Sequence, residues 1–303
     1  MDNAYIRFWG VRGSYTAPFA SHMKVGGNTS CVEIRVGDDI LVCDAGTGII
    51  PFGNAIVAQD TVRNLMLILT HYHWDHICGL PFFMPAFMKD WNIKIFGPGQ
   101  STKDIAEQLA AQMRAPYFPV ETEHWMANVE YMDPEDGAIE HGTIAITYNN
   151  VHHPGITYGY RIRVCGKTVV YISDNECFVV EKSINQRYQE FNEEERALLD
   201  KMKQEERDIE RGLISNADIL IHDAQYTPAD YEKKRSWGHS CYVDTVNFAI
   251  DANVQHLYLY HHDPNYTDED IDAIHQHCRE IVRERGSSIE CHIAREGVVV
   301  DLV

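Results

Sequence analysis

NLMLILTHYHWDH, residues 64–76, joins a run of apolar residues to a cluster of histidines and one aspartate. The run 64–70 is almost continuously apolar, which is typical of a strand that is covered on both faces. Directly after it come four potential metal ligands within six residues: His71, His73, Asp75 and His76. Imidazole nitrogens and carboxylate oxygens together suit zinc, manganese or iron. On a loop after a strand these side chains can converge, so the stretch predicts a metal site.

The pattern His-x-His-x-Asp-His resembles the signature of the metallo-β-lactamase superfamily. Further pieces of that family's pattern follow in the same order, so the resemblance covers nearly the whole chain. It implies a four-layer αββα sandwich, an α/β fold, with two divalent metal ions. It also implies that His71 and His73 bind the first metal, and that Asp75, which also serves in catalysis, and His76 bind the second.

A third histidine should complete the first metal site, and His152 and His153 compete for this role. In the tRNase Z-like branch of the superfamily, a ligand histidine stands six residues before a Gly-Tyr-Arg-Ile segment. Residues 159–162 read GYRI, and counting back six residues gives His153. Successive strand residues face opposite sides, so His152 is expected to face away. The resemblance thus favours His153 as the ligand.

Two more ligands are expected where later strands end. The predicted strand 168–173 leads into Asp174, which the resemblance places between the two metals. A carboxylate between two cations stays ionised and draws them to about 3.5–4 Å apart. A later strand-like run leads into His261 and His262, and the resemblance assigns the first of them, His261, to the second metal. His262 is the alternative, or it caps or supports its neighbour.

Two further segments resemble the tRNase Z-like phosphodiesterases. Residues 237–240 read WGHS, which is similar to an element whose histidine donates a proton and binds no metal, and this implies that His239 is a proton donor. Asp223 lies in a segment similar to the one whose acid orients that histidine, although the family usually carries Glu there. An acid paired with an imidazole can deliver a proton to a leaving alkoxide. The alternative for His239 is an exposed histidine beside a helix cap.

Glycine-rich turns at 26–30 and 44–48 resemble the family's first hairpin and the Asp-Ala-Gly turn that supports the metal loop. Asn28, in the first of these turns, is expected to contact the substrate. Strands are predicted at Cys31–Val36 and 40–43, joined as a hairpin through a Gly-Asp-Asp turn. Helices are expected at 101–113, 242–253 and 268–285 from their apolar spacing and capping residues.

Residues 1–303 are expected to form a single domain with one charged helical insertion at about 181–212. The insertion has helical apolar spacing, ten acidic residues and seven basic residues. It reads as an amphipathic helix or helical hairpin packed on the body, with a dimer contact or a lid as the alternatives. No linker rich in Pro, Gly or Ser flanks it.

The net charge of −19 disfavours polyanionic partners, so a large nucleic acid is not expected. The first residues lack the basic and apolar regions of a signal peptide, and no apolar run reaches the ~18 residues of a membrane span. The eight cysteines form no Cys-x-x-Cys pair. We therefore expect a cytoplasmic protein without a membrane partner, with a homodimer as the one oligomeric alternative.

These features favour a dinuclear phosphodiesterase, with zinc as the first choice of metal and manganese or iron as alternatives. The expected partner is a small phosphodiester such as a 3′,5′-cyclic nucleotide, because the acidic insertion has the wrong charge for holding RNA. Tyr117, Phe118 and Trp237 are candidates for stacking on a base. The alternatives are a lactonase or other carboxylic-ester hydrolase, a tRNA 3′-processing endonuclease, and a non-catalytic binding protein.

Overall fold

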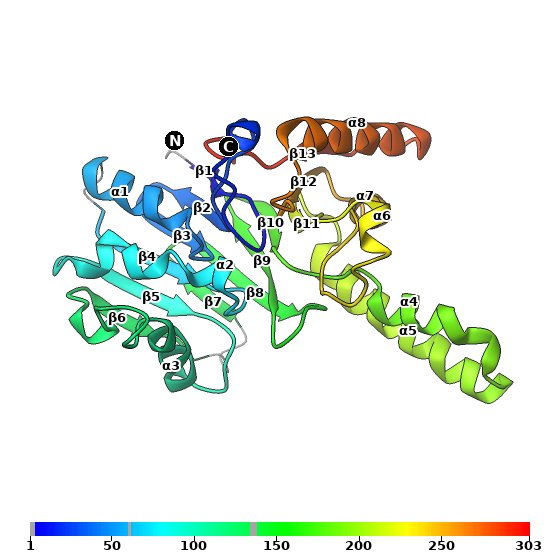
Figure 1. The fold of residues 1–303 in the computed structure, drawn as a ribbon, viewed down its shortest axis with the longest axis horizontal. Helices are drawn as coiled ribbons and strands as arrows, with labels where there is room; N and C mark the ends of the chain where they lie inside the picture. The colour runs from blue at the N-terminus through cyan, green and yellow to red at the C-terminus, as the bar shows by residue number, and fades with distance from the viewer. Residues whose placement is uncertain (1–3, 60–61, 134–137) are drawn as a thin grey trace.

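Two mixed β-sheets packed face to face, with helices on their outer sides, form the body of the protein in a computed structural model (Figure 1). The structure describes residues 4–59, 62–133 and 138–303. Each sheet has seven strands within these ranges. The predicted αββα sandwich is confirmed. Among the described helices, none is both long enough and apolar enough to cross a membrane.

The first sheet has the strand order β14-β1-β2-β3-β4-β5-β6. Its strands are β1 (Ala4–Gly10), β2 (Cys31–Val36), β3 (Asp39–Cys43), β4 (Asn64–Ile68), β5 (Asn92–Phe96), β6 (Asn128–Tyr131) and β14 (Val299–Asp301). Strands β2 and β3 pair antiparallel, as the predicted hairpin requires, whereas β3 to β6 run parallel.

The second sheet has the order β13-β12-β11-β10-β9-β8-β7. Its strands are β7 (Ala138–His141), β8 (Ile144–Asn150), β9 (Tyr158–Val164), β10 (Lys167–Ile172), β11 (Ile219–Asp223), β12 (His256–Tyr260) and β13 (Glu290–Ile293). Strands β10 to β13 run parallel. Their carboxyl ends therefore lie at one edge of the sheet, which is where ligands usually bind in such sheets.

The eight α-helices of the described residues are α1 (Ile49–Gln59), α2 (Trp74–Ile77), α3 (Thr102–Gln112), α4 (Val179–Arg187), α5 (Glu193–Ile214), α6 (Pro228–Tyr231), α7 (Tyr242–Asp251) and α8 (Asp268–Glu284). The predicted helices α3, α7 and α8 are present. Ser101 caps α3 by accepting from the Asp104 N–H, and Thr267 forms a capping box on α8. Helix α1 was not predicted, because Gly53 disfavours a helix locally.

Strand β4 is buried on both faces, as its continuous apolar sequence predicts. Met66 and Ile68 belong to the core between the two sheets. Leu65 and Leu67 belong to a second core on the other face of the first sheet, which α1 and α3 cover. This double burial fixes the strand from which the histidine loop emerges.

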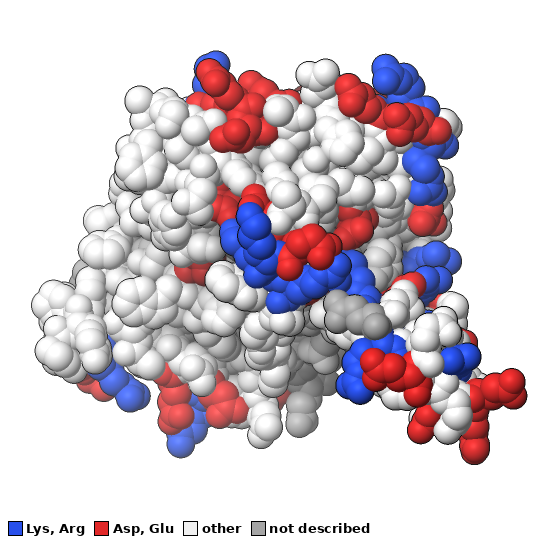
Figure 2. Space-filling view, turned by 45° about the vertical axis from the view of Figure 1, so that its right-hand side comes forward, with Lys and Arg blue, Asp and Glu red and all other residues white. Residues whose placement is uncertain are grey.

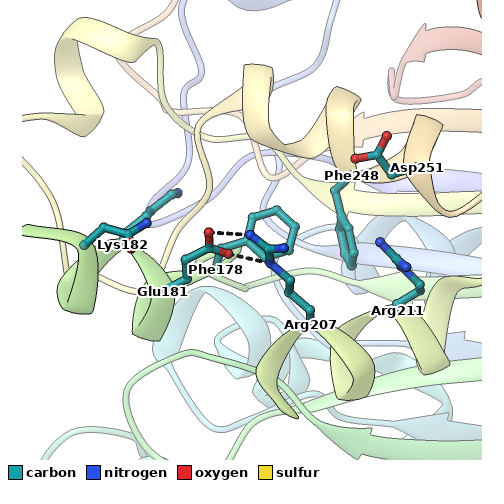
Figure 3. A pocket seen from close by; sticks show the side chains of 8 residues that line it. Phe178, Glu181, Lys182, Arg207, Arg211, Phe248 and Asp251 are labelled. Atoms are coloured by element: carbon teal, nitrogen blue, oxygen red, sulfur yellow. Dashed lines mark hydrogen bonds and ion pairs between the residues drawn. The ribbon is translucent and has the colours of Figure 1, made fainter. Parts of the chain in front are cut away.

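The charged segment 181–212 is helical, and α4 and α5 extend from the body as a pair (Figure 1). Arg207 of α5 donates from Nε to Glu181 of α4 at 2.7 Å. The Phe178 ring meets Phe248 of α7 edge to face, and a cavity of about 290 Å³ lies between these elements (Figure 3). The helical character predicted for this segment is therefore present, while its role as a lid or dimer contact stays a prediction.

Candidate metal centre

The loop after β4 turns directly into α2, and this turn aims its polar side chains inward. His73 occupies the N-cap position of α2, and Asp75 and His76 lie on the buried side of this single helical turn. Imidazoles from three other places meet them: His71 just before the turn, His153 after β8 and His261 after β12. His261 adopts a left-handed backbone conformation with φ of 58°. Such strain is found mainly where the surrounding structure demands a particular side-chain direction.

The first group consists of His71, His73 and His153, whose ligand atoms all lie within 4.8 Å of one another. His153 Nε2 is 2.9 Å from His73 Nδ1. The second group consists of Asp75, His76 and His261. His261 Nε2 lies 3.2 Å from both His76 Nε2 and Asp75 Oδ2. The structure thus brings together the two predicted triads.

Asp174 follows β10 and lies between the two groups. Its Oδ2 is 3.8 Å from His71 Nε2 and 3.7 Å from His153 Nε2, in the first group. Its Oδ1 is 3.0 Å from His76 Nε2 and 3.4 Å from His261 Nε2, in the second. One carboxylate oxygen faces each group, which is the arrangement that a bridging ligand needs.

The cluster fits two cations better than it fits an ordinary hydrogen-bond network. His71 Nε2 is buried and has no hydrogen-bond partner among the described residues, which is costly without a ligand. Burial, together with the nearby His76, lowers the pKa of His71 well below its ordinary value, so this imidazole is neutral and has a free lone pair. Burial also raises the pKa of Asp174, but His261 and His76 outweigh it and hold the carboxyl well below its usual range.

The competing histidines point elsewhere. His152 Nδ1 lies 3.0 Å from Glu210 Oε1 on α5, away from the cluster. His262 Nε2 bonds the Ala294 carbonyl at 3.1 Å, and burial lowers the pKa of His262 to about 3. The structure therefore places His153 and His261, as expected, and not their neighbours, among the clustered side chains.

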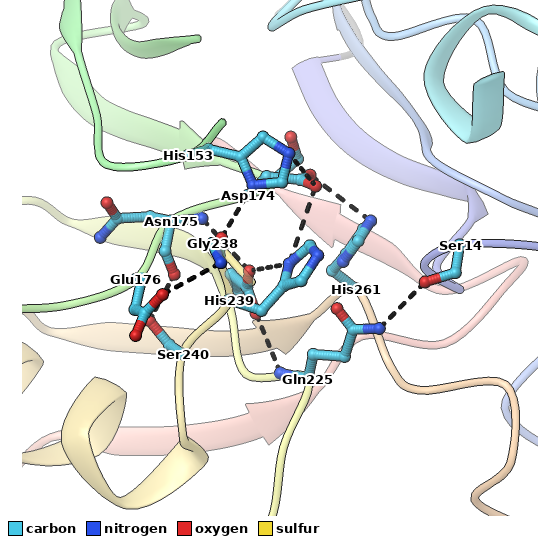
Figure 4. A network of polar contacts seen from close by, with 12 residues as sticks. Ser14, His153, Asp174, Asn175, Glu176, Gln225, Gly238, His239, Ser240 and His261 are labelled. Atoms are coloured by element: carbon cyan, nitrogen blue, oxygen red, sulfur yellow. Dashed lines mark hydrogen bonds and ion pairs between the residues drawn. The ribbon is translucent and has the colours of Figure 1, made fainter. Parts of the chain in front are cut away.

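Beside the two groups, His239 is paired with Asp223. His239 Nδ1 donates to Asp223 Oδ2 at 2.8 Å, and the His239 ring stacks on that of His261 with centroids 5.0 Å apart. Asp223 also accepts from two backbone N–H groups, those of Asn175 and Gln225. Figure 4 shows His239 within one network of polar contacts that also contains His153, Asp174 and His261. Burial lowers the pKa of His239, and its Nε2 is the ring nitrogen that does not bond Asp223.

Comparison with known proteins agrees with this geometry. Residues 40–193 match the family described as beta-lactamase superfamily domain. The chain belongs to the beta-lactamase superfamily. It is accordingly a metal-dependent hydrolase with a cluster of His and Asp residues suited to a dinuclear metal site.

Relatives cover most of the chain at low identity. The ribonuclease Z of Thermoplasma acidophilum is 24% identical over 299 residues, which cover 89% of this chain and 90% of the relative. The crystal structure of the metallo-beta-lactamase fold protein YhfI from Bacillus subtilis aligns with a TM-score of 0.65 at 20% identity, covering 99% of this chain and 100% of YhfI. Unliganded yeast PDE1 aligns with a TM-score of 0.64 at 14% identity over the full length of both chains. These structures share the fold.

Asp44 supports the histidine loop of this superfamily member from behind. It accepts from His76 Nδ1 at 2.9 Å, from Tyr171 Oη at 2.8 Å and from the Thr70 backbone N–H at 2.8 Å. Its φ is 61°, a left-handed conformation within the Asp-Ala-Gly turn that the sequence singled out. Because His76 donates Nδ1–H to Asp44, its Nε2 is left to face the cluster.

Asp44→Asn is expected to weaken metal binding by roughly 10- to 100-fold, because the amide no longer fixes the tautomer and orientation of His76. Competition with a chromogenic chelator measures this affinity. The exposed Asp90→Asn, in the turn before β5, is the matched control and should leave affinity unchanged. Equal affinity for the Asp44→Asn variant and the control would show that Asp44 does not support a ligand.

Glu176 is a buried residue that sequence reasoning missed. It accepts from the backbone N–H groups of Ser236 and Gly238 at 2.9 and 3.0 Å, and from Tyr231 Oη at 2.7 Å. The Gly238 carbonyl in turn accepts from His153 Nδ1 at 2.8 Å. Gly238 has a φ of 87°, and a Cβ there would lie 2.5 Å from His153 Nδ1, so only glycine fits. Glu176 thereby fixes the loop that orients both His153 and His239.

Asn28 has partners within the protein. Its Nδ2 donates to Glu296 Oε2 at 3.1 Å, and its Oδ1 accepts from Thr47 Oγ1 at 3.1 Å. These bonds join the two glycine-rich turns to each other and to the C-terminal segment. Both ends of the amide are engaged within the protein, which gives Asn28 a structural role, and its expected substrate contact stays a prediction.

Proposed function

We propose that this hydrolase is a dinuclear phosphodiesterase that acts on small phosphodiesters, with 3′,5′-cyclic nucleotides as the first candidates. The observation that carries the proposal is the buried Asp223–His239 pair: ligand atoms of His239, His153 and Asp174 also lie within 4.8 Å of one another, but His239 Nδ1 is engaged by Asp223. Such a pair can protonate a poor leaving group such as a ribose alkoxide. Hydrolysis of an activated ester or of a lactone does not require a separate donor of this kind.

Each side chain of the centre then has a role. His71, His73 and His153 would hold the first cation, Asp75, His76 and His261 the second, and Asp174 both. Two cations here would lower the pKa of a bound water and offset charge on the phosphoryl oxygens. In its imidazolium form, with the positive charge stabilised by Asp223 at Nδ1, His239 would give its Nε2 proton to the leaving oxygen and become neutral.

A tRNA 3′-processing endonuclease is the second candidate, because sequence relatives are named ribonuclease Z. Charge argues against it as the main activity. The net charge is −19, and Lys and Arg are interspersed with Asp and Glu on the face in Figure 2. The protruding α4–α5 pair lies in the segment 181–212 with its ten acidic and seven basic residues, so it does not offer a basic arm for RNA.

We also propose that 181–212 is an insertion within a single domain. Glu210 of α5 bonds His152 and Glu206 accepts from the backbone N–H groups of Val180 and Glu181 at 2.8 Å. These two glutamates are buried: Glu210 ties α5 to the segment next to His153, and Glu206 joins α5 to the start of α4. Because α5 is bonded to the segment beside the candidate metal centre, the α4–α5 pair is part of the same domain and not a separate domain on a linker.

The test is a hydrolysis panel on protein reconstituted with zinc, manganese or iron, with metal content measured by elemental analysis. We expect two metals per chain and turnover of bis-p-nitrophenyl phosphate and of 3′,5′-cyclic nucleotides, without 3′ cleavage of a pre-tRNA. Efficient pre-tRNA cleavage would favour the second candidate. Faster turnover of a lactone than of any phosphodiester would replace the proposal with a carboxylic-ester hydrolase, and one metal or none in folded protein would refute the dinuclear centre.

A further inference from the structure

A groove of about 440 Å³ lies between α2, the short 3-10 helix Leu80–Phe82 and α3. Five of the side chains that line it are aromatic: Tyr72, Trp74, Phe82, Tyr117 and Phe118. Of the eleven residues that line it, none carries a charge. A concave groove of this volume, lined mainly by aromatic and apolar side chains with a few polar groups, is typical of sites that bind small organic ligands.

The groove and the candidate metal centre share the single turn of α2. Asp75 and His76 face the cluster, while Trp74 and Ile77 line the groove. Trp74 is 74% exposed and follows His73, the exposed member of the first triad. A substrate whose phosphoryl group sits at the cluster would therefore extend its organic part across Trp74 into the groove.

We propose that this groove binds the nucleobase of the diester substrate, an inference that rests on the proposed phosphodiesterase function. The Tyr117 ring is 82% exposed, and Phe82 and Phe118 meet edge to face with centroids 5.4 Å apart. An exposed ring above an ordered aromatic wall offers a face on which a planar base stacks, and such stacking tolerates any base.

The polar groups of the groove favour a base over an alkyl chain. Gln108 and Gln112 of α3 place amide groups on its wall. Gln112 Nε2 donates to the Ile77 carbonyl at 3.1 Å, which anchors that side chain beside α2. Amide groups pair with the donors and acceptors on the edge of a base, whereas an alkyl chain would strip water from these amides without replacing its hydrogen bonds.

The test measures binding, so that it is independent of turnover. On metal-loaded protein, calorimetry compares adenosine 5′-monophosphate, ribose 5-phosphate and hexyl phosphate as probes. We expect the nucleotide to bind more tightly than ribose 5-phosphate. Tyr117→Leu should weaken nucleotide binding by about 5- to 100-fold, the loss expected for one stacked base, and should leave ribose 5-phosphate binding unchanged. Tyr117→Phe, which keeps the ring, should retain nucleotide affinity.

Phe19→Ala removes an exposed aromatic ring elsewhere and should change none of the three affinities. Equal binding of the nucleotide and ribose 5-phosphate, or equal nucleotide affinity in Tyr117→Leu and wild type, would overturn the proposal. Tighter binding of hexyl phosphate than of the nucleotide would overturn it in favour of an apolar chain. If the ring-dependent nucleotide affinity appears but no phosphodiester is hydrolysed, the base subsite stands and the proposed reaction fails.

Discussion

His239→Ala should lower kcat for a 3′,5′-cyclic nucleotide by roughly 10²–10⁴-fold and leave the metal content intact. The loss should depend on the leaving group, since a general acid acts on the leaving oxygen. A ribose alkoxide needs a proton, whereas p-nitrophenolate leaves readily without one. The ratio of kcat between variant and wild type should therefore be far closer to one for bis-p-nitrophenyl phosphate than for the cyclic nucleotide.

Asp223→Asn is the matched variant for this experiment. It keeps a group that can accept from His239 Nδ1, but it removes the charge that stabilises the imidazolium, so the same pattern should appear in weaker form. His261→Ala, by contrast, should lower metal content and slow all substrates together. If His239→Ala reduces metal occupancy as His261→Ala does, His239 is a ligand. If it slows nothing, the phosphodiesterase proposal loses its main support.

Asp174→Ala is expected to impair both metal sites at once, because each oxygen of the carboxylate faces one group of ligands. Loss of the charge that draws the two cations together should weaken the binding of both cations. The rate of hydrolysis should then fall equally for all substrates, whatever their leaving group. A loss of about 4 kcal/mol of transition-state stabilisation corresponds to roughly 10³-fold in rate. Elemental analysis and kcat for bis-p-nitrophenyl phosphate check the two parts of the expectation.

The exposed Asp272→Ala on α8 is the control for Asp174→Ala and should change neither metal content nor rate. Since the alanine also removes a buried charge from among the histidines, the unfolding transition of the metal-free variant should be recorded. A folded Asp174→Ala protein that retains two metals per chain would contradict the bridging role.

Sequence reasoning predicts most of this fold where local pattern and global structure agree. The apolar run of β4 and the capping residues of α3 and α8 each encode their element locally, and a strand end followed by ligand types marks the centre. Helix α1 was missed because Gly53 lowers its local preference for a helix, and its apolar contacts with the outer core outweigh that preference. Strands β5 and β6 were also missed; they are short and are stabilised by parallel pairing with distant partners.

The supporting residues of the site are less visible in the sequence. Glu176 is one of many glutamates, and only the folded chain brings it beneath the loop with Ser236 and Gly238. For Asn28, the partner Glu296 is distant in sequence, so no local signal reveals that its amide is already engaged. Residues that act through others depend on tertiary contacts, which periodicity and motif spacing do not record.

Each group of candidate ligands draws on both halves of the sandwich. His71, His73, Asp75 and His76 follow β4 of the first sheet, whereas His153, Asp174 and His261 follow strands of the second. Metal ions bound there would cross-link the two sheets of the sandwich. Their binding energy then adds to the cohesion of the halves, by about 4 kcal/mol for one site when the free ion is a thousandfold above its dissociation constant. The concentration of free metal would thus set the stability of the two-sheet sandwich, as well as whether the centre can react.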